Sequence, residues 1–264
     1  MIITVVGNDH RQKELAKLLN RQHDTFYLGG SEDWEKAKSI LKISDIVIFP
    51  LPFSRDNKMI NNTHFEIDKT IKALQKDTLI FAGGYNIDDK NRKIIDYNVD
   101  EEFVLKNAFY TAESAMALSI INTSFSLCDA KILILGNGRI GKALQGMLTL
   151  FCENLTVSAR KQKDFDYLKK HNSNSVHTEK IQDLSEFDVI FNTIPASVLS
   201  KDTIKSIKRD ALIIDLASKN SLLNIANANY IDAKALPAKY CMKSSAKALL
   251  KVLDKHIKIF LRGK

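Results

Sequence analysis

Three glycines at the spacing G-x-G-x-x-G lie in the stretch KILILGNGRIGKALQ, residues 131–145. The apolar residues before them predict a strand, and the residues after them predict a helix. Gly136 allows a tight turn, Gly138 lets backbone N–H groups approach a phosphate, and Gly141 lets the helix pack closely on the strand. The motif therefore predicts a site for the diphosphate of a dinucleotide. The residues expected to contact it are Gly136, Asn137, Gly138, Arg139 and Ile140.

The residues after the next expected strand carry a hydroxyl and positive charges. An NAD site usually places Asp or Glu there, about 20 residues beyond the glycines, to bind the ribose 2′-OH. This chain reads TVSARKQK, which supplies Ser158, Arg160 and Lys161 and no carboxylate before Asp164. A hydroxyl and two cations suit a 2′-phosphate, so the sequence predicts NADP as the cofactor. The alternative is that the two cations are ordinary solvated side chains.

Two later strands are expected to end in polar residues, within FNTIPASVL (191–199) and IIDLASKN (213–220). Ligands of open α/β sheets bind at the carboxyl ends of strands, and Asp215 and Ser218 stand at such an end. The alternative is that these polar residues only cap the strands. The residues expected near the nicotinamide and its ribose are Asn192, Thr193, Ile194, Pro195, Ala217 and Ser218.

The beginning of the chain, VVGNDHRQKEL, offers candidates for binding a substrate. Asp9 suits the N-cap of the following helix, and Arg11 falls in its first turn. Because a cation is unfavourable at a helix N-terminus, Arg11 is expected to face an anion such as a carboxylate; the alternative is a plain surface arginine. Thr111 and Glu113 are further substrate-side candidates. Glu113 could act as an acid or base, although glutamates in a first turn also simply suit the dipole.

Other catalytic chemistries lack support in the sequence. The six histidines are scattered and form no HExxH motif, and no Gly-x-Ser-x-Gly motif is present. The three cysteines, Cys128, Cys152 and Cys241, are widely spaced, so we expect reduced thiols, no disulfide framework and no metal site. Hydride transfer to a bound cofactor is the favoured chemistry, and no catalytic residue is assigned.

The elements that must position these residues alternate between β-rich runs and helical stretches, which predicts α/β structure with parallel sheets. Strands are expected at 2–6, 25–28, 46–49, 78–82, 132–135, 155–158, 189–193 and 212–215. Helices are expected at 10–19, 33–41, 65–74, 110–127, 139–151, 164–170 and 202–207, followed by a last amphipathic helix. The expected fold is two doubly wound, Rossmann-like domains linked by long helices, with a cleft between them.

The domain boundaries follow from this pattern. Residues 1–109 are expected to form a substrate-side α/β domain, and residues 110–127 a connecting helix. Residues 128–241 are expected to form the NADP-binding domain, and residues 242–264 an amphipathic helix that could pack back on the first domain. In that last helix Lys243, Lys247, Lys251 and Lys255 recur every four residues, which indicates a solvated basic face.

The composition is that of a soluble globular protein, with 264 residues, 45% hydrophobic and 27% charged. No apolar run is long enough to span a membrane, and the N-terminus reads as a strand, so we expect a cytoplasmic protein without a membrane partner. The net charge of +8 is concentrated in the tail, where eight Lys and one Arg oppose only Asp254 from Lys234 onward. A nucleic-acid partner is not expected, because the tail lacks interleaved aromatic residues and a known module.

The ordered set of motifs resembles the A subunits of dipicolinate synthase from spore-forming bacteria. The likeness covers nearly the whole chain and is carried by GNDHRQKEL, TAESAMALSI, LILGNGRIGKAL, SARK, NTIPASVL and DLAS. The resemblance implies a two-domain NADP-dependent subunit that works with a flavoprotein-like B subunit; a homo-oligomer is compatible with it. It also implies conversion of 4-hydroxy-tetrahydrodipicolinate, a small dicarboxylate, to dipicolinate in the cytoplasm of the mother cell during sporulation.

The chain departs from that family's pattern in two loops. Lys219, Asn220 and Ser221 replace Arg-Pro-Gly-Gly, and ALPAKYCMKSSAK replaces a Gly-Leu-Pro-Gly turn with its Pro-Lys-Thr-Ala-Gly continuation. Ala235 and Ala238 cannot adopt a positive φ without a cost that glycine avoids, so this loop is expected to be remodelled. Two alternatives stay open. One is another two-domain NADP dehydrogenase of the shikimate or methylene-tetrahydrofolate type, and the other is a non-catalytic nucleotide-binding subunit.

Overall fold

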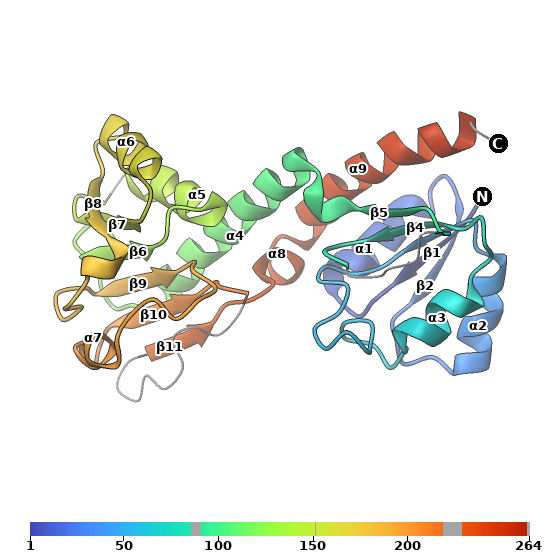
Figure 1. Cartoon of the computed structure of the whole chain (residues 1–264), viewed down its shortest axis with the longest axis horizontal. Coiled ribbons are helices and arrows are strands. Elements are labelled where there is room, and N and C mark those ends of the chain that lie inside the picture. Colours follow the sequence, from blue (N-terminus) through green and yellow to red (C-terminus); the bar gives the residue numbers. More distant parts are fainter. Residues whose placement is uncertain (86–90, 151, 219–228, 263–264) are drawn as a thin grey trace. The chain divides into compact units, whose positions relative to one another are not determined.

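The computed structural model describes residues 1–85, 91–150, 152–218 and 229–262. The described chain divides into two compact units (Figure 1). The first unit contains Met1–Asn107 and Pro237–Lys264, and the second contains Ala108–Leu236. Each unit is built around its own parallel sheet, so the predicted fold class, two Rossmann-like α/β domains, is confirmed. The departure at residues 219–221 lies outside the described residues.

The sheet of the first unit has five parallel strands in the order β2-β1-β3-β4-β5. Its strands are β1 (Ile2–Val6), β2 (Asp24–Leu28), β3 (Ile46–Ile48), β4 (Leu79–Ala82) and β5 (Ile94–Asp96). Its helices are α1 (His10–Leu19), α2 (Trp34–Ile43), α3 (Ile67–Ala73) and α9 (Met242–Arg262). The 3₁₀ turn η1 (Tyr97–Val99) precedes α4 (Glu101–Ile121), whose first residues belong to this unit and whose remainder belongs to the second.

The apolar face of α9 packs against α1. Ala246, Leu249, Leu253 and Ile257 are buried, as the amphipathic pattern predicts. The basic face is partly neutralised by carboxylates at the start of α4. The Nζ of Lys251 lies 2.6 Å from the Glu102 carboxylate, and the next lysine along this face pairs with Asp100. None of the helices in the described ranges is long and apolar enough to cross a membrane.

The sheet of the second unit has six parallel strands in the order β11-β10-β9-β6-β7-β8, the doubly wound arrangement. They are β6 (Ile132–Leu135), β7 (Leu155–Ala159), β8 (Asn174–His177), β9 (Val189–Asn192), β10 (Leu212–Asp215) and β11 (Asn229–Asp232). The helices are α5 (Arg139–Leu148), α6 (Gln162–Lys170), α7 (Lys201–Lys205) and the short α8 (Leu236–Lys239), which begins at the unit boundary; η2 (Thr178–Lys180) is a 3₁₀ turn.

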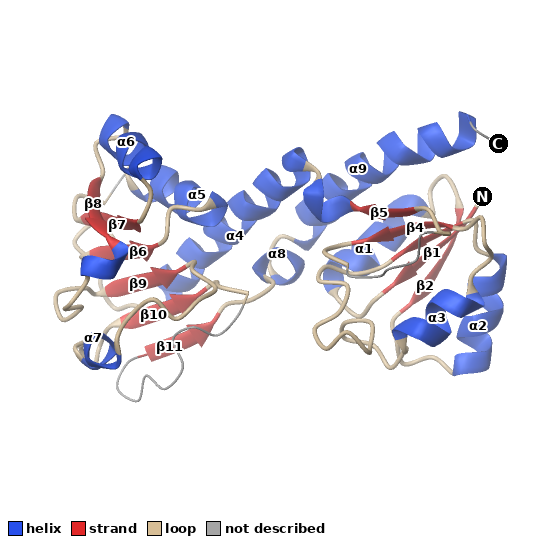
Figure 2. Cartoon of the chain, viewed as in Figure 1, coloured by secondary structure: helices blue, strands red, loops and turns tan. Residues whose placement is uncertain are grey.

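Both faces of this second sheet are covered, as the alternating residues of β6 demonstrate. Ile132 and Ile134 pack in a core with Leu144 and Leu148 of α5. Leu133 and Leu135 face the opposite side, in a separate core that includes Ile207 next to α7. Figure 2 shows the strands of this sheet between these helices. Successive strands are added on one side of β6 (β7, β8) and then on its other side (β9, β10, β11). The switch point of the strand order therefore lies between β6 and β9, which is where doubly wound sheets bind ligands.

Two differences between the observed and the expected elements matter for the argument. The edge strands β5, β8 and β11 have no expected counterpart, because their residues are half-buried or exposed and show little apolar pattern. The helix expected at 110–127 begins at Glu101 and ends at Ile121. Its early start has a local cause, since the Asp100 carboxylate accepts a hydrogen bond from Phe103 N–H at 2.9 Å in the manner of an N-cap.

Candidate functional site

The turn between β6 and α5 needs its first and third glycines for steric reasons. Gly136 has φ +97°, and a Cβ there would lie 2.7 Å from Thr193 Oγ1. A Cβ on Gly141 would lie 2.1 Å from the Gly136 carbonyl oxygen, so the helix rests directly on the turn. A Cβ on Gly138, in contrast, would meet nothing within 4 Å. The middle glycine therefore leaves open space beside the backbone, as the approach of a phosphate requires.

The N-terminus of α5 is open. Gly138 is the N-cap and supplies no side chain, and the first intrahelical bond runs from Lys142 N–H to the Gly138 carbonyl at 2.8 Å. The N–H groups of Arg139, Ile140 and Gly141 lie in the first turn, where no intrahelical carbonyl can accept from them. Together with the helix dipole, these donors favour an anion at this end of α5.

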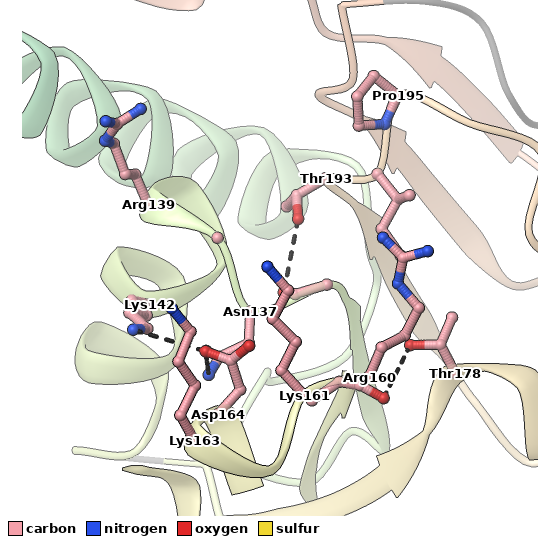
Figure 3. A pocket seen from close by; sticks show the side chains of 14 residues that line it. Asn137, Arg139, Lys142, Arg160, Lys161, Lys163, Asp164, Thr178, Thr193 and Pro195 are labelled. Atoms are coloured by element: carbon pink, nitrogen blue, oxygen red, sulfur yellow. Dashed lines mark hydrogen bonds and ion pairs between the residues drawn. The ribbon is translucent and has the colours of Figure 1, made fainter.

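A cavity of about 430 Å³ opens at this turn (Figure 3). Its volume falls within the range of small-molecule sites. Its lining comes from the β6–α5 turn, the end of β7, the start of α6, η2 and the loop after β9. The lining residues are Gly136, Asn137, Gly138, Arg139, Lys142, Ala159, Arg160, Lys161, Lys163, Asp164, Thr178, Thr193, Ile194 and Pro195.

The cavity is strongly electropositive, because five of the residues that line it are Lys or Arg. Arg160, Lys161 and Lys163 are exposed, and none of the described carboxylates forms an ion pair with them. Asp164 contributes a negative charge, but its carboxylate lies 3.7 Å from Lys142 Nζ and accepts from Asn137 Nδ2 at 3.5 Å. Figure 3 shows both contacts as dashed lines. The cations at the end of β7 are therefore available to an anionic ligand.

Asn137 provides a second indication that the cavity takes a ligand. The residue is 8% exposed, and its Oδ1 is buried without a hydrogen-bond partner among the described residues. A buried acceptor of this kind costs free energy unless a donor reaches it. The open helix end, the exposed cations and this unpaired acceptor fit a dinucleotide, which carries a diphosphate and ribose hydroxyls.

The structure brings most of the residues expected to bind the cofactor into this cavity. They are Gly136, Asn137, Gly138, Arg139, Arg160, Lys161, Thr193, Ile194 and Pro195. Ile140 packs instead against the apolar core beside α5. Ser158 lies behind the cavity wall and is fully buried, and its hydroxyl accepts a hydrogen bond from Gly136 N–H at 3.0 Å. Ser158 thus holds the glycine turn from below.

Asn192, Ala217 and Ser218 do not line the cavity either. Asn192 and Ala217 are buried at the ends of β9 and β10, whereas Ser218 is exposed. Thr193 supports the turn through its Oγ1, which donates to the Leu135 carbonyl at 2.8 Å.

Sequence reasoning missed five lining residues: Lys142, Ala159, Lys163, Asp164 and Thr178. Lys142 follows Arg139 by three residues on α5, so helical periodicity could have found it. Thr178 had no such signal, because it follows β8, an edge strand that the sequence pattern does not reveal. Its Oγ1 lies 3.1 Å from Ser158 Oγ, which places Thr178 behind the same turn.

In the first unit, Asp9 and Arg11 lie together at the start of α1. Asp9 is the N-cap, and its Oδ1 accepts from Gln12 N–H at 2.8 Å. Arg11 is 3% exposed, and its Nη2 donates to Asp9 Oδ2 at 3.4 Å and to the Leu51 carbonyl at 3.1 Å. Arg11 is therefore a buried, paired arginine. Its Nε is buried without a partner among the described residues.

The other two substrate-side candidates lie in the second unit, on α4. Thr111 is buried and Glu113 is exposed. Both residues make interactions of their own. The four candidates thus divide between the two units, two at the start of α1 and two on the part of α4 that begins at Ala108.

Comparisons with known proteins agree with this fold. The A subunit of dipicolinate synthase from Bacillus subtilis (strain 168) is 23% identical over 280 residues, covering 96% of this chain and 94% of the relative. The crystal structure of the Bacillus subtilis protein superimposes with a TM-score of 0.77 at 20% identity, over 100% of this chain and 98% of that one. The A subunit of dipicolinate synthase from Bacillus halodurans gives a TM-score of 0.80 at 20% identity, covering 98% and 97%.

A family model identifies the nucleotide-binding part. The model for D-isomer specific 2-hydroxyacid dehydrogenase, NAD binding domain, matches residues 112–257, which include the whole cavity lining. The resemblance to dipicolinate synthase A subunits is confirmed. The family also supports two further conclusions, that the chain is an oxidoreductase and that its cofactor is a nicotinamide nucleotide. Because the model matches more than half of the chain, this protein belongs to the D-isomer specific 2-hydroxyacid dehydrogenase family through its NAD-binding domain.

Proposed function

We propose that this chain is an NADP-dependent oxidoreductase subunit that works on a small cyclic dicarboxylate, as its resemblance to the dipicolinate synthase A subunits implies. The Bacillus subtilis relative aligns with nearly the full length of both chains. The proposed reaction converts 4-hydroxy-tetrahydrodipicolinate to dipicolinate by loss of water and then of a hydride and a proton. The proposed setting is the cytoplasm of the mother cell during sporulation, and the proposed partner is a flavoprotein-like B subunit.

One observation carries the choice of NADP over NAD. The end of β7, where NAD-specific sites place a carboxylate for the ribose 2′-OH, carries Ala159, Arg160 and Lys161 in this chain. The two cations are exposed and line the cavity. A guanidinium offers a forked set of donors to a phosphate, and an ammonium adds a point charge. Asp164 does not replace the missing carboxylate, because Lys142 and Asn137 already engage it.

The proposed roles in the second unit follow the cavity. The first-turn amides of α5 bind the diphosphate, and Arg160 and Lys161 bind the 2′-phosphate. The loop 193–195 borders the nicotinamide half of the site. Ala217 and Ser218 do not line the cavity, and we propose that they contribute to this half from behind the loop. When bound, the nicotinamide accepts the hydride. The protein contributes orientation and the exclusion of water.

In the first unit, the proposed substrate contacts lie at the start of α1, at Asp9 and Arg11. Thr111 and Glu113, on the part of α4 that belongs to the second unit, are proposed separately as substrate-side residues. The strand order of the first unit reverses direction between β1 and β3, and ligands of such sheets bind at the carboxyl ends of those strands. Arg11 bridges these ends, because it follows β1 and donates to the Leu51 carbonyl after β3. A substrate carboxylate would share the Arg11 guanidinium with Asp9.

Replacing Arg160 tests the cofactor assignment. Arg160→Ala should weaken NADP binding by roughly 1.5–3 kcal/mol, as expected for a charge-assisted contact, and leave NAD nearly unchanged. Calorimetric titration of the same preparation with both nucleotides measures the difference. Arg209→Ala, which removes an exposed arginine outside the cavity lining, is the matched control and should affect neither. Equal losses for NADP and NAD in Arg160→Ala would contradict the assignment.

Turnover tests the proposed reaction separately. The purified chain is combined with its B-type partner and the dicarboxylate substrate, and NADPH formation is followed by absorbance. NADPH formation with this substrate, and none with shikimate or methylene-tetrahydrofolate, would support the proposal. Tight NADP binding without turnover in any combination would favour a non-catalytic nucleotide-binding subunit instead.

A further inference from the structure

A fully buried carboxylate connects three elements at the carboxyl ends of strands in the second sheet. Asp215, the last residue of β10, is 0% exposed. Its Oδ1 accepts from Asn192 Nδ2 at 2.9 Å and from Ala217 N–H at 3.1 Å. Its Oδ2 accepts from the hydroxyl of Tyr230 at 2.8 Å. The donors come from the end of β9, the loop after β10 and strand β11.

The register of the strands explains why these residues meet. Asp215 is paired with Asn192 on β9 and with Asp232 on β11, so these side chains point to the same face of the sheet. Tyr230 precedes Asp232 by two residues and therefore shares that face. A buried carboxylate is costly unless donors satisfy it, and here each oxygen has at least one. Three neutral donors are thus committed to this single group.

The network reaches the cavity through Asn192. An amide side chain carries its donors on Nδ2 and its acceptor on Oδ1, so the bond to Asp215 fixes which way the amide faces. Oδ1 is then directed to Ile194 N–H, from which it accepts at 3.1 Å. Ile194 and its neighbours Thr193 and Pro195 line the cavity. Asp215 also accepts from Ala217 N–H, so the same carboxylate holds the first residues after both β9 and β10.

Tyr230 is suited to act as a constant donor in this network. Burial, and next its hydrogen bond to Asp215, raise the pKa of its hydroxyl above the usual range for tyrosine. The hydroxyl therefore keeps its proton at physiological pH and can donate only to the carboxylate it faces.

The strand order indicates which half of a dinucleotide this network serves. A doubly wound sheet consists of two mononucleotide-binding halves that meet at the switch point. Strands β6–β8 form the half that carries Arg160 and Lys161, and strands β9–β11 form the other half. We propose that Asp215 and Tyr230 are positioning residues for the nicotinamide half of the cofactor, an inference that rests on the proposed NADP function. They act through Asn192 and Ala217 and do not touch the cofactor.

Two ligands separate the halves experimentally. NADPH uses both halves of the site, whereas adenosine 2′,5′-bisphosphate uses only the half with Arg160 and Lys161. In the full chain, Tyr230→Phe removes one donor and keeps the ring, and it should raise the Kd for NADPH about fivefold. The Kd for adenosine 2′,5′-bisphosphate should stay within about twofold of the wild-type value. Asp215→Ala should show the same selectivity with a larger loss of NADPH affinity.

Calorimetry with both ligands gives the result, and thermal unfolding reports whether each variant is folded. Tyr27→Phe, which removes a tyrosine hydroxyl from the first unit, is the control and should change neither Kd. If Asp215→Ala does not fold, Tyr230→Phe still decides. Equal losses for the two ligands, or no loss for either, would overturn the inference. Failure of the wild-type chain to bind either ligand would instead contradict the proposed cofactor.

Discussion

The first strand–turn–helix segments of the two units are alike, but the helices that follow the turns are capped differently. In both, a parallel strand leads through a glycine of positive φ, Gly7 or Gly136, into a helix of ten residues. In the first unit Asp9 caps α1, and its carboxylate accepts from the backbone at 2.8 Å. In the second unit Gly138 occupies the N-cap and contributes no side chain. One turn is closed by its own negative charge, and the other is left open.

This difference decides which of the two turns can bind a diphosphate. A helix N-terminus supplies unpaired N–H groups and a positive dipole end in either unit. Asp9 satisfies that end internally and also pairs with Arg11, so the first unit has little attraction left for a diphosphate. Gly138 leaves the same groups free and adds the space that a Cβ would occupy. A single position at the helix start therefore separates an internally capped turn from a candidate diphosphate-binding turn.

The largest expected effect concerns the contact that holds the open turn in shape. Gly141→Ala would place a Cβ 2.1 Å from the Gly136 carbonyl oxygen. Because this oxygen belongs to the backbone, no flexible side chain can move to relieve the clash. The free energy of unfolding should fall by about 3 kcal/mol, as for severe overpacking. Urea denaturation measures the change. Gly146→Ala on the same helix meets nothing within 4 Å and should be neutral or stabilise by about 0.5–1 kcal/mol. Equal behaviour of the two variants would refute the close packing.

The next effect comes from converting the open turn into the closed type. Gly138→Asp introduces a capping carboxylate at the N-cap of α5, where the backbone is extended and accepts any residue. NADP affinity should fall about 100-fold, or about 2.7 kcal/mol, because the new charge repels the diphosphate and takes its donors. Stability should stay within a few tenths of a kcal/mol or rise. Unchanged NADP affinity in titrations of this variant would show that the diphosphate does not bind here.

Removing the capping carboxylate of α1 should have a smaller effect. This effect is on the free energy of unfolding. Asp9→Ala removes the cap of α1, which costs about 1 kcal/mol. It also leaves the buried Arg11 without its carboxylate partner, at a further cost of about 1 kcal/mol. Chemical denaturation should therefore show a loss of about 2 kcal/mol. Asp9→Asn, which keeps an acceptor for the cap, should recover about half of it. If the ion pair with Arg11 contributed nothing, Asp9→Asn would recover the whole loss, because Asp9→Ala would then lack only the cap.

The sequence predicts the open turn well because its demands are local. The three glycines, the strand before them and the helix after them occupy one short stretch, and steric constraints on a turn act at that range. Arg160 and Lys161 were found for a similar reason, since distance from the glycines locates the end of the second strand. The structure places both in the cavity lining, as expected, while their binding of a 2′-phosphate stays a prediction.

The parts that escaped prediction depend on distant residues. Ser158 was assigned to the ligand by type and position, but its neighbours direct its hydroxyl to Gly136 N–H behind the cavity. The network around Asp215 joins residues of β9, β10 and β11, and β11 has no pattern that marks it as a strand. Edge strands bury few side chains, so alternation of apolar residues does not reveal them. Their contributions to a site become visible only when the sheet order is known.

The smallest expected effect concerns Ala235, a residue other than glycine that adopts a positive φ. Gly7 and Gly136 show how both units use glycine where φ is positive, whereas Ala235 has φ +57° with its Cβ in place. The turn thus has a left-handed residue at a position where the sequence resemblance leads us to expect glycine. For an alanine this conformation costs about 1 kcal/mol.

Ala235→Gly should therefore raise the free energy of unfolding by up to about 1 kcal/mol, because relief of the strain outweighs the greater chain entropy of glycine. Thermal and urea unfolding measure it. Ala238→Gly is the matched control, since Ala238 is buried within the short helix α8 and gains nothing from glycine. That control should lose about 1 kcal/mol through helix propensity. A gain in the free energy of unfolding for Ala235→Gly with a loss for Ala238→Gly would confirm that the strain is confined to Ala235. A loss in both variants would show that Ala235 is not strained.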